Sequence, residues 1–143
     1  MSRGTMNSTT AAPLRGPFYV VLAFDAIVRH DLVGIALDHD PAASVLACTS
    51  LPDAIAAIES SPVLSVAFLE LGPRRTARAG VDTLVHSRGG RVVLFGDVAE
   101  DEAGTPGFAA GAWTVLLRPF TSRSVCALLS APGVAGTDAP RGR

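Results

Sequence analysis

Lysine is absent from this chain of 143 residues, and arginine accounts for all 12 of its basic side chains. The formal net charge is only -1, so bulk electrostatics do not favour nucleic acid or an anionic membrane surface as a partner. The sequence also has no apolar run near the roughly 18 residues that a membrane span needs. These absences lead us to expect a cytoplasmic protein that binds neither nucleic acid nor membrane.

Cysteine is scarce as well, and Cys48 and Cys126 are too far apart in the sequence for a paired metal or redox motif. The sequence has no phosphate-binding P-loop, no dinucleotide glycine fingerprint and no nucleophile elbow. The only dense group of possible metal ligands is 38–40, which we interpret as a solvated loop. We therefore expect no cofactor, no resident metal and no enzymatic activity.

Hydrophobic residues make up 48% of the chain, enough for a substantial core. The segments 1–17 and 131–143 are instead rich in small and turn-forming residues, which favours flexible tails. We place one folded domain at 18–130. The short second tail leads us to expect no separate output domain.

Within 18–130, short apolar runs alternate with segments of helical periodicity. This alternation predicts a parallel sheet covered by helices on both faces. Five strand–helix units in this order predict a flavodoxin-like (βα)5 three-layer α/β sandwich with sheet order 2-1-3-4-5. The expected strands are 18–24, 44–48, 63–71, 91–95 and 114–117.

Several local signals place the helices. Ser50 is expected to cap the helix that starts at about residue 51, and Thr121 the final helix. One helix is expected within 74–88, starting after Arg74 and Arg75, because arginine near a helix start opposes the macrodipole. The sequence at 104–107 should leave a short or distorted helix within 97–110.

The segment 109–120 carries the most specific pattern of the chain. It reads Ala-Ala-Gly-Ala, then Trp113-Thr114-Val115-Leu116-Leu117, and closes on Arg118-Pro119-Phe120. This pattern resembles the last strand of a response-regulator receiver domain. The resemblance extends over nearly all of 18–130 in its order of elements, although only 109–120 is specific in sequence.

The resemblance implies a defined set of groups at the carboxyl ends of the strands. Receivers place there an acid pair that holds a divalent cation, a phosphoacceptor aspartate, a Thr or Ser, and a lysine. In this chain the acid pair reads Phe24-Asp25, the phosphoacceptor position holds Glu70 and the hydroxyl position holds Gly96. Arg118 stands at the lysine position, and these departures from the family pattern lead us to expect that conventional phosphoryl transfer is lost.

The fifth strand departs from the family as well. Val115 takes the place of the aromatic residue that reports phosphorylation, and a valine is too short and stiff to swing inward. Arg118 retains a positive charge that could fork onto the Glu70 carboxylate, so we expect an ion pair between them.

Two of these positions have an alternative interpretation. Asp25 is a weak candidate metal ligand, and it could equally cap the first helix. Glu70 could mimic a weakly activated state, or it could be a polar residue at a strand end. The acidic run 97–102 could be a solvated face or could steer a partner.

We therefore expect a stand-alone degenerate receiver, or pseudo-receiver, that acts as a protein-interaction module in two-component or phosphorelay signalling. Its partner would be a histidine kinase, a regulator or another target. The expected docking surface, also possible for a homodimer, combines the helix within 97–110, the last strand and the final helix, with Trp113, Val115 and Phe120. Two alternatives are phosphorylation on Asp25 or Asp97, and a small-molecule sensor with a pocket at Phe24 and Gly96.

Overall fold

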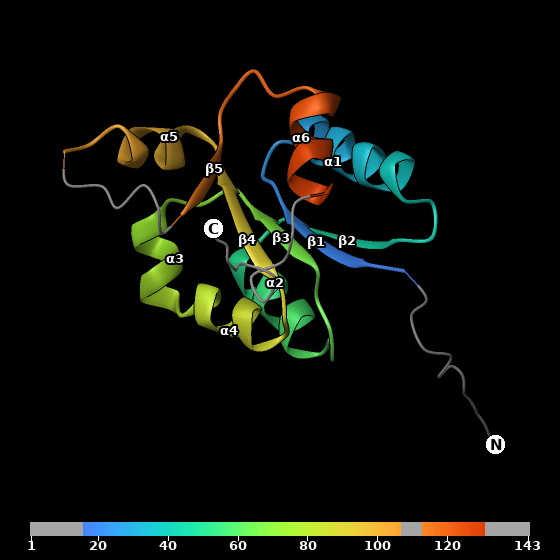
Figure 1. The fold of residues 1–143 in the computed structure, drawn as a ribbon. Coiled ribbons are helices and arrows are strands. Elements are labelled where there is room, and N and C mark those ends of the chain that lie inside the picture. Colours follow the sequence, from blue (N-terminus) through green and yellow to red (C-terminus); the bar gives the residue numbers. More distant parts are fainter. Residues whose placement is uncertain (1–15, 107–112, 131–143) are drawn as a thin grey trace, which may run out of the picture.

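The structure is a computed structural model that describes residues 16–106 and 113–130. In this part of the chain, five parallel strands form one sheet in the order β2-β1-β3-β4-β5, which confirms the predicted topology (Figure 1). The strands are β1 (Phe18–Leu22), β2 (Ser44–Cys48), β3 (Val66–Leu69), β4 (Arg91–Phe95) and β5 (Thr114–Leu116).

The described residues form six helices. Four of them follow β1, β2, β4 and β5 singly, whereas two separate helices connect β3 to β4. The helices are α1 (Ala26–His39), α2 (Leu51–Glu59), α3 (Pro73–Ala79), α4 (Val81–Ser87), α5 (Asp97–Ala103) and α6 (Ser122–Ser130).

The helices cover the sheet on both faces, so that the three predicted layers are present. α1 and α6 lie side by side on one face, and α2 and α4 lie on the other (Figure 1). Successive residues of each strand point to opposite faces, which gives two cores. Val20 and Leu22 of β1 belong to the core under α2 and α4, while Tyr19 and Val21 belong to the core under α1 and α6.

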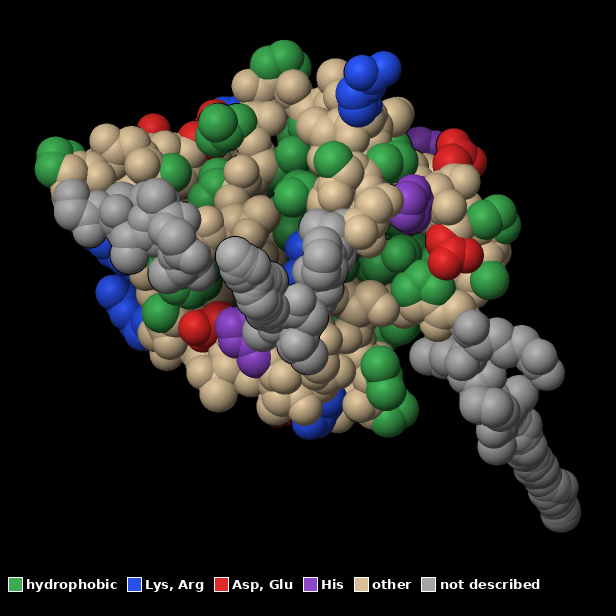
Figure 2. All heavy atoms as spheres, viewed as in Figure 1, with side chains coloured by type: hydrophobic (Ala, Val, Ile, Leu, Met, Phe, Trp, Pro, Cys, Tyr) green, Lys and Arg blue, Asp and Glu red, His purple; other side chains and the backbone are tan. Residues whose placement is uncertain are grey.

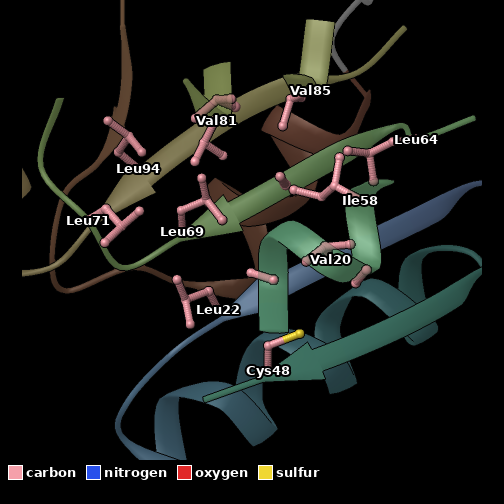
Figure 3. Packing of buried hydrophobic residues seen from close by; sticks show 14 of the residues in the cluster. Val20, Leu22, Cys48, Ile58, Leu64, Leu69, Leu71, Val81, Val85 and Leu94 are labelled. Atoms are coloured by element: carbon pink, nitrogen blue, oxygen red, sulfur yellow. The ribbon is translucent and has the colours of Figure 1, made fainter. Parts of the chain in front are cut away.

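The core under α2 and α4 is the larger of the two. In Figure 3, Ile58 of α2 and Val81 of α4 lie over Leu69 and Leu94 of the central strands. All four residues are fully buried, with an exposed fraction of 0%. The near-continuous apolar runs of β3 and β4 are thus explained by burial on both faces.

Three predicted strands are longer than the observed ones, and the last of them ends at Leu116 and not at residue 117. The first ends at Leu22 and not at residue 24, and the third covers Val66–Leu69 and not 63–71. Hydrophobicity alone set the predicted ends, but apolar residues here continue into loops. Val63, for example, is 62% exposed.

The single helix predicted within 74–88 is wrong, because Gly80 divides it. Gly80 has a φ of 72°, in the left-handed region that glycine adopts without strain, and it ends α3 and precedes α4. Arg74 and Arg75 were expected in a loop but lie in the first turn of α3. Both side chains are exposed, and water there screens their repulsion from the helix dipole.

The predicted helix caps are confirmed. The Ser50 hydroxyl accepts a hydrogen bond from the Asp53 N–H at 3.2 Å, and the Thr121 hydroxyl accepts one from the Ser124 N–H at 3.1 Å. The helix after β4 is short, as expected, and ends at Gly104. These local signals are encoded within a few residues of one another, which explains why the sequence reveals them.

Some expectations concern residues outside the described ranges. These are the tails at 1–17 and 131–143, apart from residues 16 and 17, and the Ala-Ala-Gly-Ala segment 109–112. Across the described residues, no helix has the length and apolar character needed to cross a membrane.

Candidate functional site

The candidate site lies at the carboxyl edge of the sheet, where the central parallel strands end level with one another. Leu22 of β1 is in register with Leu69 of β3, and Leu69 with Leu94 of β4. The residues that follow these strands therefore meet. In this way the fold brings together Phe24 and Glu70, which are far apart in sequence.

Glu70 joins β3 to the loop after β1 through both its backbone and its side chain. Its N–H donates to the Leu22 carbonyl at 2.9 Å, which extends the strand ladder by one step. Its carboxylate Oε1 accepts the Phe24 N–H at 2.8 Å. The carboxylate at the phosphoacceptor position thus holds a backbone amide in place.

Gly96 completes this contact by leaving room for Glu70. Its φ of 101° and ψ of 177° form a conformation that is essentially restricted to glycine. A Cβ added at this position would lie 2.8 Å from the Glu70 Cγ. The Glu70 methylenes therefore occupy the space that a side chain at position 96 would need.

Asp25 caps α1, which was the alternative to metal binding. Its Oδ1 accepts the N–H groups of Ile27 at 2.7 Å and Val28 at 3.2 Å. The described residues contain no group of three or more His, Cys, Asp or Glu side chains placed to hold a metal ion. With Asp25 on α1 and Glu70 on the Phe24 amide, these residues do not fit the magnesium site that the resemblance implies.

The predicted ion pair between Arg118 and Glu70 is wrong. The Arg118 guanidinium instead pairs with Asp97 and with Glu100, whose Oε2 lies 2.9 Å from Nε. Glu100 also accepts the Arg118 backbone N–H at 3.1 Å. Two carboxylates on α5 outcompete the single Glu70 carboxylate, which is engaged by an amide. The Arg118–Pro119 peptide bond is cis.

The contact between Arg118 and Glu100 shifts the pKa of both side chains. The side-chain hydrogen bond from Arg118 lowers the pKa of Glu100 below its usual range. The hydrogen bonds to Glu100 and Asp97 raise the pKa of Arg118 further above its already high value. Both shifts favour the charged forms. The ion pairs of Arg118 with Asp97 and Glu100 connect α5 to the residues that follow β5.

Sequence reasoning missed the structural role of the acidic run after β4. Glu100 binds Arg118, and Glu102 accepts the N–H of Arg74 in the first turn of α3 at 3.0 Å. Helix periodicity could have placed both side chains on α5. It could not identify their partners, which lie on other elements.

The three residues expected at a docking surface all contact the cores. Trp113 and Val115 are half-buried against the core under α2 and α4. Phe120 packs edge-on against Phe95, with ring centroids 6.0 Å apart. Large apolar side chains that remain exposed near this surface are Leu117, at 61%, and Val98 of α5, at 55%.

A cavity of about 250 Å³ opens between the loops that follow β1, β3 and β4. Phe24 and Gly96 both line it, at the place where the sequence predicts a pocket for the sensor alternative.

On the face shown in Figure 2, acidic and basic side chains are scattered among other types, without a continuous basic surface.

The geometry can be compared with known proteins. No protein-family model and no curated protein matches this sequence. Solved structures do resemble the fold. A response regulator receiver protein from Sinorhizobium medicae WSM419 has 20% sequence identity and a TM-score of 0.54, and the match covers 83% of this chain and 98% of that chain.

A response regulator receiver protein from Burkholderia phymatum is similar to the same extent. Its sequence identity is 21% and its TM-score is 0.57, with 82% of this chain and 98% of that chain covered. The likeness agrees with the five-stranded sheet of order 2-1-3-4-5. This chain therefore has the flavodoxin-like fold of response regulator receivers, as its sequence pattern predicts.

Replacing Gly96 by alanine tests the steric match with Glu70. The backbone conformation alone should cost about 1–3 kcal/mol of unfolding free energy, and the contact with the Glu70 Cγ should add to this. In a Glu70→Ala background the penalty should fall by about 1 kcal/mol or more, which urea denaturation of all four proteins would measure. Gly34→Ala is the control, because an added Cβ there meets nothing within 4 Å. Equal penalties in both backgrounds would contradict the match.

The Glu100–Arg118 pair should make stability depend on pH. Because the pKa of Glu100 is lower in the folded state, the stabilisation is complete above the ordinary glutamate value of about 4.3. It should disappear as the pH falls through the lowered pKa. Glu100→Gln should therefore reduce the loss of stability between about pH 5 and pH 3, as followed by thermal unfolding. An unchanged pH profile would contradict the pair's contribution, and Arg118→Gln should reproduce the effect.

Proposed function

We propose that this protein is a signalling module that binds a protein partner without phosphoryl transfer. The proposal is supported above all by the engagement of Glu70, whose carboxylate accepts the Phe24 amide. A phosphoacceptor must be free to attack a phosphoryl group beside a bound metal ion. Here Glu70 bonds to the backbone, and Asp25 caps α1.

The remaining positions support the same interpretation. Gly96 offers no hydroxyl, and Arg118 is bound by Asp97 and Glu100. Asp97 was the other acid considered as a phosphoacceptor, and its pairing with Arg118 disfavours that role. The signalling assignment itself comes from the receiver fold, and a fold supports many functions.

The docking surface that we propose consists of α5, β5 and α6. Two features favour it. The network of Arg118, Asp97 and Glu100 connects α5 to the end of β5, and such a connection reduces the ordering entropy that is lost on binding. Leu117 supplies an exposed apolar group beside it. The expected partners are a histidine kinase, another regulator or a second copy of the chain.

The absence of phosphoryl transfer can be tested with a small-molecule phosphodonor. Incubation with acetyl phosphate and Mg²⁺ should produce no mass increase corresponding to one phosphoryl group, because within the described residues no acceptor carboxylate belongs to a group of side chains that could hold the cation. A receiver with the complete set of acids is the positive control for the reagent. Magnesium-dependent uptake of a phosphoryl group that is lost in Glu70→Gln would overturn this part of the proposal.

The docking surface can be tested by affinity capture of the partner on immobilised protein. Leu117→Ala should weaken capture about fivefold or more, because an apolar anchor at an interface contributes about 1 kcal/mol or more. Val63→Ala is a matched control, since its side chain is 62% exposed and lies before β3 at the opposite edge of the sheet. Equal capture by wild type and Leu117→Ala would remove this surface from consideration.

A further inference from the structure

The cavity at the carboxyl edge has walls that are already in place. Gly72 and Gly96 form parts of these walls. A Cβ added at Gly72 would lie 2.6 Å from the Val98 Cγ1, and one added at Gly96 would lie 2.8 Å from the Glu70 Cγ. The surrounding elements are thus packed closely, and the cavity is a defined hollow between them.

One part of the lining is apolar. Leu71 and Phe95 are 3% and 2% exposed and form the deep part of the cavity. Phe24 and Val98 also line it, and they remain 51% and 55% exposed. Large apolar side chains at the mouth of a cavity gain free energy when a ligand covers them.

The lining also carries two charges of opposite sign, those of Glu70 and Arg75. Asp97 lies at the cavity too, but it is engaged by Arg118, which it shares with Glu100. Glu70 uses Oε1 to hold the Phe24 amide and has no ion pair within the described residues. Across the same ranges, the Arg75 guanidinium makes no hydrogen bond or ion pair. One carboxylate and one guanidinium are therefore available to a ligand.

We propose that this cavity binds a small zwitterion with an apolar group, the chemistry of an apolar α-amino acid. The ligand ammonium lies at Glu70 and its carboxylate at Arg75, and its apolar group covers Phe24 and Val98. The volume of about 250 Å³ fits a ligand smaller than drug-sized molecules, which occupy about 300 Å³ or more. The two charge contacts, Glu70 and Arg75, lie outside α5, β5 and α6, so they can be tested separately from the proposed docking surface, although Val98 of the apolar lining belongs to α5.

Three related probes separate the two charge contacts. Leucine carries both charges, leucinamide lacks the carboxylate, and N-acetyl-leucine lacks the ammonium. Titration of the ¹⁵N-labelled protein, followed at the amides of Gly72 and Gly96, should give leucine a Kd on the order of 1 mM. Both derivatives should bind more weakly. Equal binding of the three probes, or no shift at about 10 mM leucine, would overturn the proposal.

Variants assign each charge to its partner. Glu70→Gln keeps an acceptor for the Phe24 amide but should weaken leucine binding roughly tenfold, and should leave N-acetyl-leucine binding unchanged. Arg75→Gln should weaken leucine binding only about threefold, because the guanidinium is exposed, and should leave leucinamide binding unchanged.

The control is Arg74→Gln, which removes the same charge from the next residue of α3. Arg74 does not line the cavity, so its replacement should not change leucine binding. Equal losses in Arg74→Gln and Arg75→Gln would indicate general electrostatic attraction and would overturn the assigned contact. Failure of the partner-capture experiment would not affect any of these titrations.

Discussion

Carboxylates that accept backbone N–H groups hold the carboxyl edge of this protein together. Four side chains do so, and each closes a loop or caps a helix start. Hydrogen bonds from amides to an ionised carboxylate are stronger than those between neutral groups, and they favour the charged form. The four acceptors are Asp25, Glu70, Glu100 and Glu102, which bind the amides of Ile27 and Val28, of Phe24, of Arg118 and of Arg74.

The direction of the chain explains why the acids gather at this edge. All five strands are parallel, so the first helix after each strand begins at the carboxyl edge. Helix starts expose unpaired N–H groups and the positive end of the dipole. In receivers the same edge holds the acids for a metal ion and a phosphoryl group. In this chain comparable carboxylates accept backbone N–H groups instead. The hydrogen bonds that hold the loops at this edge are therefore also the reason for the proposed loss of phosphoryl transfer.

The sequence predicted the parts of this structure that depend on local or periodic signals. Strand–helix alternation gave the sheet order, and Ser50 and Thr121 marked helix starts through partners three residues away. It did not predict which carboxylate Arg118 would bind. Several acids follow neighbouring strands, and the choice among them depends on side-chain reach in three dimensions. The division at Gly80 was missed because the apolar positions that indicated a helix, Val81, Leu84 and Val85, all lie after it.

The opposite edge of the sheet gives the exclusive use of arginine a structural consequence. Helices end there, and their last carbonyls need donors. Arg88 donates through Nε to the Ile58 carbonyl at 3.3 Å and through Nη2 to the Glu59 carbonyl at 3.0 Å, at the end of α2. Arg91 donates through Nη2 to the single Leu128 carbonyl, near the end of α6. The nitrogens of a planar guanidinium can donate to two successive carbonyls, whereas an ammonium group is a compact point charge. Arg88 therefore connects the end of α4 to the end of α2 through two hydrogen bonds.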